Sequence, residues 1–121
     1  MANPFVHVEL GTTDIDTAKS FYQSMFDWRL DDVEMPGGMT YTLIHVGEGT
    51  GGGMMKQMVP NAPSSWMAYV QVDDIRAATD KAKSLGATIM RDVMAVMDEG
   101  FLSIIRDPTG AMLGLWQSKA K

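Results

Sequence analysis

Hydrophobic and polar positions follow one pattern that occurs twice along the chain. Residues 5–15 and 65–75 each form a short alternating or apolar run that ends in Asp-Ile. After each run, apolar residues recur at helical spacing, at Ile15, Ala18, Tyr22 and Met25 and again at Ile75, Ala78, Ala82 and Leu85. This spacing is typical of an amphipathic helix that packs on a sheet. The sequence therefore predicts two copies of one structural unit.

The ends of both predicted helices carry capping residues. Thr13 or Asp14 precedes the first helix and Asp73 or Asp74 precedes the second. Their side-chain oxygens can accept hydrogen bonds from the unpaired amides of the first helical turn. Gly86 follows the second helix, where a left-handed residue commonly ends a helix.

The remainder of each copy is predicted to form three strands. They are expected around residues 28–33, 41–46 and 52–58 in the first copy, and around 88–93, 102–107 and 111–117 in the second. Asp107-Pro-Thr-Gly110 has the residues of a reverse turn. The segment 59–65 is polar, contains proline and reads as a linker. The pattern predicts one domain, residues 1–121, with βαβββ modules at 1–58 and 65–121.

Composition excludes several classes of function. Among 121 residues, 15 are acidic and 10 basic, and the basic ones are scattered singly, which argues against nucleic-acid binding. The absence of cysteine removes disulfides, thiolate metal sites and a cysteine nucleophile. No apolar run is long enough to span a membrane and no secretory signal is visible, so a cytoplasmic location is expected.

One motif suggests a nucleotide site that its context does not support. Residues 47–52 match the spacing G-x-G-x-x-G. The dinucleotide-binding motif requires a helix to begin at its last glycine. The repeat instead predicts a hairpin here, so no nucleotide cofactor is expected.

Several segments together resemble the vicinal oxygen chelate superfamily. They are residues 7–14, Phe21-Tyr22, Trp28 and the ending Arg106–Leu115. This superfamily includes glyoxalase I, bleomycin- and fosfomycin-resistance proteins and extradiol dioxygenases. The resemblance covers nearly the whole chain. It implies an α+β fold of two βαβββ modules, whose eight strands form a cupped mixed sheet with the helices packed outside. Because a second subunit often completes the cup, a homodimer is expected.

The resemblance also implies a divalent metal ion, held by the first and last strands of each module. The four corresponding positions are occupied by His7, Gly53, Met67 and Gly114. Histidine is a suitable ligand, thioether sulfur is a poor ligand for hard divalent ions, and glycine offers no side chain. We therefore expect no bound metal and no other cofactor, and a restored glutamate at position 53 or 114 would favour metal binding.

Strand alternation indicates which residues face a ligand. His7 and Glu9 lie on the opposite face of their strand from Val8. By the repeat and the resemblance, the expected ligand-binding residues are His7, Glu9, Met67, Tyr69, Met112 and Trp116. This mixture of polar, aromatic and apolar side chains suits a small organic molecule. His7 and Glu9 are also the candidates for catalysis, although a hydrogen-bonding or purely structural role remains open for both.

Three functions remain compatible with the sequence. The first is a small-molecule-binding protein, like glyoxalase and bleomycin-resistance proteins, with a largely lost metal site. The alternative is an enzyme, either a glyoxalase-like lyase or isomerase or a dioxygenase. The third is an interaction module without a ligand.

Overall fold

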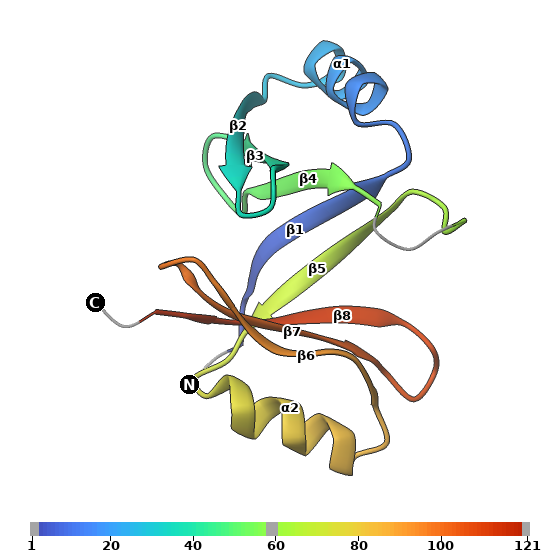
Figure 1. Ribbon diagram of the computed structural model, residues 1–121, viewed down its shortest axis with the longest axis vertical. Helices are drawn as coiled ribbons and strands as arrows, with labels where there is room; N and C mark the ends of the chain where they lie inside the picture. Colours follow the sequence, from blue (N-terminus) through green and yellow to red (C-terminus); the bar gives the residue numbers. More distant parts are fainter. Residues whose placement is uncertain (1–2, 58–60, 120–121) are drawn as a thin grey trace. The chain divides into compact units, whose positions relative to one another are not determined.

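A computed structural model describes residues 3–57 and 61–119 (Figure 1). Within them the chain forms eight strands and two helices in the order βαβββ, repeated once. The elements are β1 (Phe5–Thr12), α1 (Ile15–Met25), β2 (Arg29–Met35), β3 (Met39–His45), β4 (Gly52–Lys56), β5 (Ser65–Gln71), α2 (Ile75–Ser84), β6 (Thr88–Val96), β7 (Gly100–Arg106) and β8 (Met112–Ser118). The predicted α+β class and the order of its elements are confirmed.

The chain divides into two compact units with the same internal topology. The first unit comprises residues 7–67, and the second comprises residues 68–121 with the N-terminal segment 1–6. In the first unit the strands lie in the order β2-β3-β4-β1, and β1 is parallel to β4. In the second the order is β5-β8-β7-β6, and β5 is parallel to β8. The repeat in the sequence thus corresponds to a repeat in strand pairing.

Aspartate caps start both helices. The side chain of Asp14 accepts from the backbone N–H of Thr17 at 3.1 Å, and that of Asp74 accepts from Ala77 at 3.0 Å. The second residue of each predicted pair is therefore the cap. Gly86 has φ of +102°, as expected for the left-handed residue that ends α2.

Each unit has its own hydrophobic core between its helix and one face of its strands. Leu10, Ile44 and Met54 form the first core, against which Ala18 and Tyr22 of α1 pack. The second core is formed by Ile75, Ile105 and Leu115, with Ala78 and Ala82 of α2 packed against it. Three residues of each predicted helical stripe face these cores. The last residue of each stripe does not: Met25 is 56% and Leu85 is 68% exposed, because each lies at the end of its helix, beyond the core.

The connections explain where the strand predictions needed adjustment. The glycine-rich segment 47–51 leads into β4, which is antiparallel to β3, so the predicted hairpin is confirmed and no helix follows the motif. Strand β6 runs to Val96, beyond the predicted end, and it pairs with β7 over this length with two register shifts. The carboxylate of Asp107 accepts from the N–H groups of Thr109 and Ala111 and thereby stabilises the predicted turn. Residues 58–60 of the predicted linker region lie outside the described residues.

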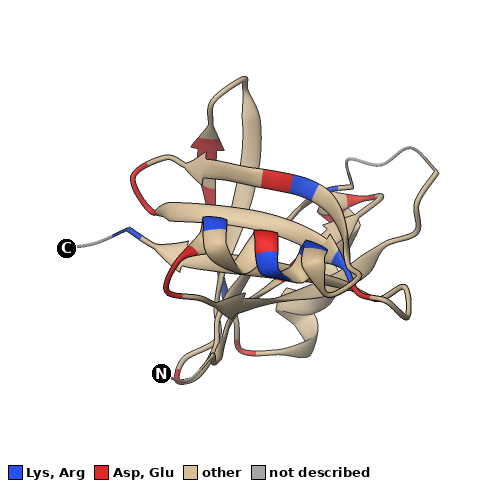
Figure 2. Cartoon of the chain, turned by 90° about the horizontal axis from the view of Figure 1, so that it is seen from below, with Lys and Arg blue, Asp and Glu red and all other residues tan. Residues whose placement is uncertain are grey.

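Charged residues lie on separate elements and not in one patch. Figure 2 shows lysines and arginines distributed singly among acidic residues over the helices and strands. No helix within residues 3–57 and 61–119 has the length and apolar character needed to cross a membrane.

Two leucine-to-alanine substitutions test the assignment of the first core. Leu10 is 4% exposed whereas Leu85 is 68% exposed. Leu10→Ala should lower the free energy of unfolding by about 2–5 kcal/mol, because it removes buried contacts and leaves a cavity. Leu85→Ala makes the same chemical change at an exposed site and should cost under about 0.5 kcal/mol. Denaturant titration measures both values, and equal losses would show that Leu10 is not a core residue.

Candidate functional site

The hydroxyl of Tyr41 connects the two polar side chains predicted on β1. It lies 2.7 Å from Nε2 of His7 and donates a hydrogen bond to Oε2 of Glu9 at 2.8 Å. Tyr41 comes from β3, so the group extends from β1 to β3 across the intervening β4. His7 and Glu9 stand two residues apart on one strand and meet through the phenol, on the face opposite Leu10 and α1.

The hydrogen bonds also define the protonation of His7. A phenol has one proton, and that of Tyr41 is donated to the Glu9 carboxylate. The Tyr41 oxygen must then accept from Nε2–H of His7. Burial lowers the pKa of His7 below its ordinary value and so favours the neutral ring. A neutral ring protonated at Nε2 carries a lone pair at Nδ1, which is able to accept a proton or a hydrogen bond.

Tyr41 also fills the space beside Gly53. A Cβ atom built on Gly53 would overlap the ring and hydroxyl of Tyr41. Leu43 is the register partner of Gly53, and Tyr41 lies two residues before it on the same face of β3. The side-chain position that the resemblance assigns to a metal ligand is therefore occupied by a phenol from the neighbouring strand.

The second unit has the same arrangement at Gly114. Tyr69 is the register partner of Gly114, and a Cβ on this glycine would overlap the Tyr69 ring. Tyr69 is 3% exposed. Each unit thus pairs a glycine on its last strand with a tyrosine on a neighbouring strand.

The other predicted ligand-binding residues differ in exposure. Met112 and Trp116 lie with Gly114 on the face of β8 opposite the core residue Leu115, and Met112 is 46% exposed. Trp116 is half-buried and its indole N–H donates to Ser118 Oγ at 3.1 Å. Met67 is half-buried and belongs to the first unit.

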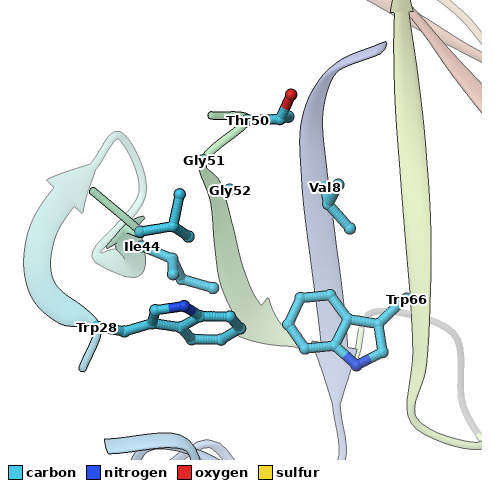
Figure 3. A pocket seen from close by; sticks show the side chains of 8 residues that line it. Val8, Trp28, Ile44, Thr50, Gly51, Gly52 and Trp66 are labelled. Atoms are coloured by element: carbon cyan, nitrogen blue, oxygen red, sulfur yellow. The ribbon is translucent and has the colours of Figure 1, made fainter. Parts of the chain in front are cut away.

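A cavity in the first unit lies on the helix-facing side of the strands. It has a volume of about 250 Å³ and is lined by Val8, Trp28, Ile44, Val46, Thr50, Gly51, Gly52 and Trp66. Figure 3 shows the indoles of Trp28 and Trp66 at one end, with Ile44 and Val8 on either side. Trp66 donates to the Tyr22 hydroxyl at 3.3 Å and meets Trp28 at a centroid distance of 6.4 Å. This cavity is apolar and lies on the opposite face from His7 and Glu9.

Sequence reasoning missed Tyr41 and the cavity. The available signal for Tyr41 was a glycine that faces an aromatic residue on the next strand, since a missing side chain leaves space that a ring can fill. That signal requires the register of β3 and β4, and the glycine-rich turn before β4 leaves this register ambiguous. Among residues 3–57 and 61–119, no group of three His, Asp or Glu side chains is placed to hold a metal ion.

Comparisons with known proteins relate the whole domain to one family. The model of the Glyoxalase/Bleomycin resistance protein/Dioxygenase superfamily matches residues 5–115. The chain is 39% identical over 115 residues to "Putative glyoxylase CFP32" of Mycobacterium tuberculosis, a match that covers 92% of this chain and 44% of that protein. It is 23% identical over 123 residues to the anthracycline biosynthesis protein DnrV of Streptomyces peucetius, covering 90% of this chain and 45% of that protein. The chain therefore spans less than half the length of these curated relatives.

A solved structure supports the fold. Methylmalonyl-CoA epimerase from Mycobacterium tuberculosis matches with a TM-score of 0.72 at 16% identity, over 96% of this chain and 88% of the epimerase chain. At this identity the likeness establishes the fold and not the activity.

Alanine at Gly53 tests the packing of Tyr41. Gly53→Ala should destabilise the protein by about 1–3 kcal/mol, because the added methyl group overlaps the phenol. In a Tyr41→Ala background the same substitution should cost much less, giving a coupling energy of about 0.5–3 kcal/mol. Denaturant midpoints of the wild type, both single variants and the double variant supply the cycle.

Gly11→Ala is the matched control for this cycle. Gly11 lies on β1, and a methyl group added there would have the flexible amide end of Gln57 as its nearest neighbour, at 3.3 Å. The substitution should be close to neutral, since the amide can move. Additive effects of Gly53→Ala and Tyr41→Ala would contradict the packing described above.

The pH dependence of stability tests the burial of His7. Because the folded-state pKa of His7 is lowered, protonation favours the unfolded chain. Stability should therefore fall as the pH decreases through about 6.5, the ordinary pKa of histidine, and the His7 contribution should level off below the folded-state pKa. His7→Gln should lose this part of the slope and His45→Gln should retain it. Chemical denaturation between about pH 5 and 8 gives the three curves; identical slopes for His7→Gln and wild type would refute the assignment.

Proposed function

We propose that this chain, which belongs to the Glyoxalase/Bleomycin resistance protein/Dioxygenase superfamily, binds a small organic molecule without the help of a metal ion. The observation that carries the proposal is the position of Tyr41. Its phenol occupies the side-chain space beside Gly53 and is hydrogen-bonded to both His7 and Glu9.

The residues at the four family positions do not fit a divalent metal ion. A carboxylate at position 53 or 114 would require Tyr41 or Tyr69 to leave its place. Nε2 of His7 is engaged by the Tyr41 oxygen, and Met67 offers only a thioether. The expectation that glutamate at either glycine restores metal binding therefore needs a second substitution that removes the tyrosine.

The polar group supplies directional contacts for a ligand. Burial favours the neutral ring of His7, the hydrogen bond to Tyr41 favours its proton at Nε2, and the Glu9 carboxylate is an acceptor. Polar groups that are already fixed by hydrogen bonds bind a ligand at a lower entropic cost than mobile ones. In the second unit, Met112 and Trp116 supply apolar and aromatic surface on the sheet face, and we propose both as ligand contacts of that unit.

A metal-independent isomerase or lyase is the second candidate. The continuous hydrogen bonds from His7 through Tyr41 to Glu9 favour it, because a neutral imidazole with a lone pair at Nδ1 can act as a general base. In this case a proton taken up at Nδ1 would be stabilised by the Glu9 charge through the phenol. Catalysis by the whole protein is proposed here only in this form. The homodimer expected from the resemblance remains a prediction.

A thermal-shift screen with metal analysis tests the proposed function. Protein purified without chelator should contain no stoichiometric divalent ion by elemental analysis. A library of small metabolites screened in the presence of chelator should contain compounds that raise the melting temperature, because a ligand that binds only the folded state stabilises it. His7→Ala should weaken binding of such a compound by about 1–3 kcal/mol, the range for a lost hydrogen bond in a desolvated site.

Val8→Ala is the control for this screen. Val8 lies on the opposite face of β1 and lines the apolar cavity, so its truncation should reduce stability without weakening the compound selected through His7. One equivalent of metal that is lost in His7→Ala would contradict the proposal, as would compounds that stabilise only when a metal is added.

A further inference from the structure

We propose that the second unit binds an organic anion, whose charged group contacts Arg91 and Arg106 on the sheet face of that unit. This inference rests on the proposed function and adds the chemical class of the ligand. It follows from the positions of the two guanidinium groups and from the residues that surround them.

The strand register places both arginines on one face. Arg106 is the partner of Met112, and Arg91 is the partner of Ile104, which stands two residues before Arg106 on β7. The neighbouring residues Ile105 and Leu113 belong to the core under α2, so alternation directs Arg106 and Ile104 to the opposite face. Arg91 follows a register shift in β6, and its pairing with Ile104 places it on that same face. Residues in this diagonal relation lie about 7–8 Å apart, which is within reach of two long side chains.

Within the described residues, Arg91 and Arg106 have no ion pair of the kind that Arg29 and Arg76 have. Arg29 lies 3.7 Å from the Asp31 carboxylate, and Arg76 lies 3.2 Å from that of Asp92. In the described parts of the chain, no carboxylate lies within 4.0 Å of Arg91 or Arg106. The polar contact of Arg91 is a hydrogen bond from Nη1 to the sulfur of Met94 at 3.3 Å, and a thioether is a weak acceptor.

This arrangement has an energetic consequence. Two neighbouring cations on one sheet face repel each other, and the aspartates that follow them in the chain have other partners: Asp92 pairs with Arg76, and Asp107 accepts from Thr109 and Ala111. An anion that binds both groups removes the repulsion and gains charge-assisted hydrogen bonds. The chain has 15 acidic residues, so the absence of a carboxylate at this place is not explained by composition.

The surroundings of the arginines define the rest of the ligand. Met94 and Met112 are 39% and 46% exposed and lie on the same face, with Trp116 on β8 in register with Leu102. Flexible thioethers and an indole form an adaptable apolar surface. The matching molecule has a flat or aliphatic body and one carboxylate, phosphate or sulfonate group.

Two fluorescent probes that differ in charge provide the test. The anionic probe is 1-anilinonaphthalene-8-sulfonate and the neutral probe is N-phenyl-1-naphthylamine, which has a closely similar aromatic body. The folded protein should bind the anionic probe more tightly than the neutral one. Raising the salt concentration from about 50 to 500 mM should weaken the binding of the anionic probe only.

Arginine variants locate the charge recognition. Arg106→Gln and Arg91→Gln should each raise the dissociation constant of the anionic probe by about three- to tenfold, because each removes a charged donor. Both substitutions should leave the dissociation constant of the neutral probe unchanged. Arg29→Gln removes an exposed arginine of the first unit, and as the matched control it should change neither probe.

The outcomes separate this inference from the proposed function. If Trp116→Leu weakens the neutral probe but neither arginine variant weakens the anionic one, the choice of an organic anion is wrong and small-molecule binding stands. If neither probe is affected by Trp116→Leu, the ligand face itself is wrong. Competition of inorganic phosphate or acetate with the anionic probe identifies which anionic group is preferred. The proposal would be overturned if neither ion competes and the arginine variants bind the anionic probe with unchanged affinity.

Discussion

A tyrosine ring that occupies the side-chain space of a glycine on a nearby strand is the constraint on which the candidate site depends. In the first unit Tyr41 fills the space at Gly53, and in the second unit Tyr69 fills that at Gly114. Protein interiors are close-packed, so the space left by the missing side chain of a glycine is filled by a neighbouring aromatic ring. Once Tyr41 lies there, its hydroxyl reaches both polar residues of β1.

This constraint determines the chemistry available to the first unit. An imidazole, a phenol and a carboxylate in one hydrogen-bonded series can bind a polar group or move a proton. A carboxylate side chain at position 53 is incompatible with this series, because the Tyr41 phenol occupies the volume that it would need. The repeated glycine–tyrosine pairing indicates that both units follow one packing solution, and in the first unit this packing brings Tyr41 to His7 and Glu9.

The predictable features were those set by local spacing. The apolar stripes of both helices, the aspartate caps and the turn at Asp107 depend on residues within a few positions of each other. Each was found as predicted except the last residue of each stripe, Met25 and Leu85, which is exposed. The choice of Asp14 over Thr13 and of Asp74 over Asp73 required coordinates, because both members of each pair have capping oxygens. Tyr41 could not be predicted in the site, since its role depends on the register between β3 and β4. The pairing of Arg91 with Ile104 likewise depends on two register shifts in β6 that no local pattern reveals.

The protonation of the His7 imidazole tests most directly whether Tyr41 takes the place of a metal ligand. Two-dimensional ¹⁵N–¹H NMR of the imidazole ring at neutral pH reports which nitrogen carries the proton. We expect a neutral ring protonated at Nε2, a changed Nε2 environment in Tyr41→Phe, and no shift on addition of one equivalent of zinc. A ring protonated at Nδ1, or a zinc-induced shift at one equivalent, would contradict the claim that Tyr41 takes the place of a metal ligand beside His7.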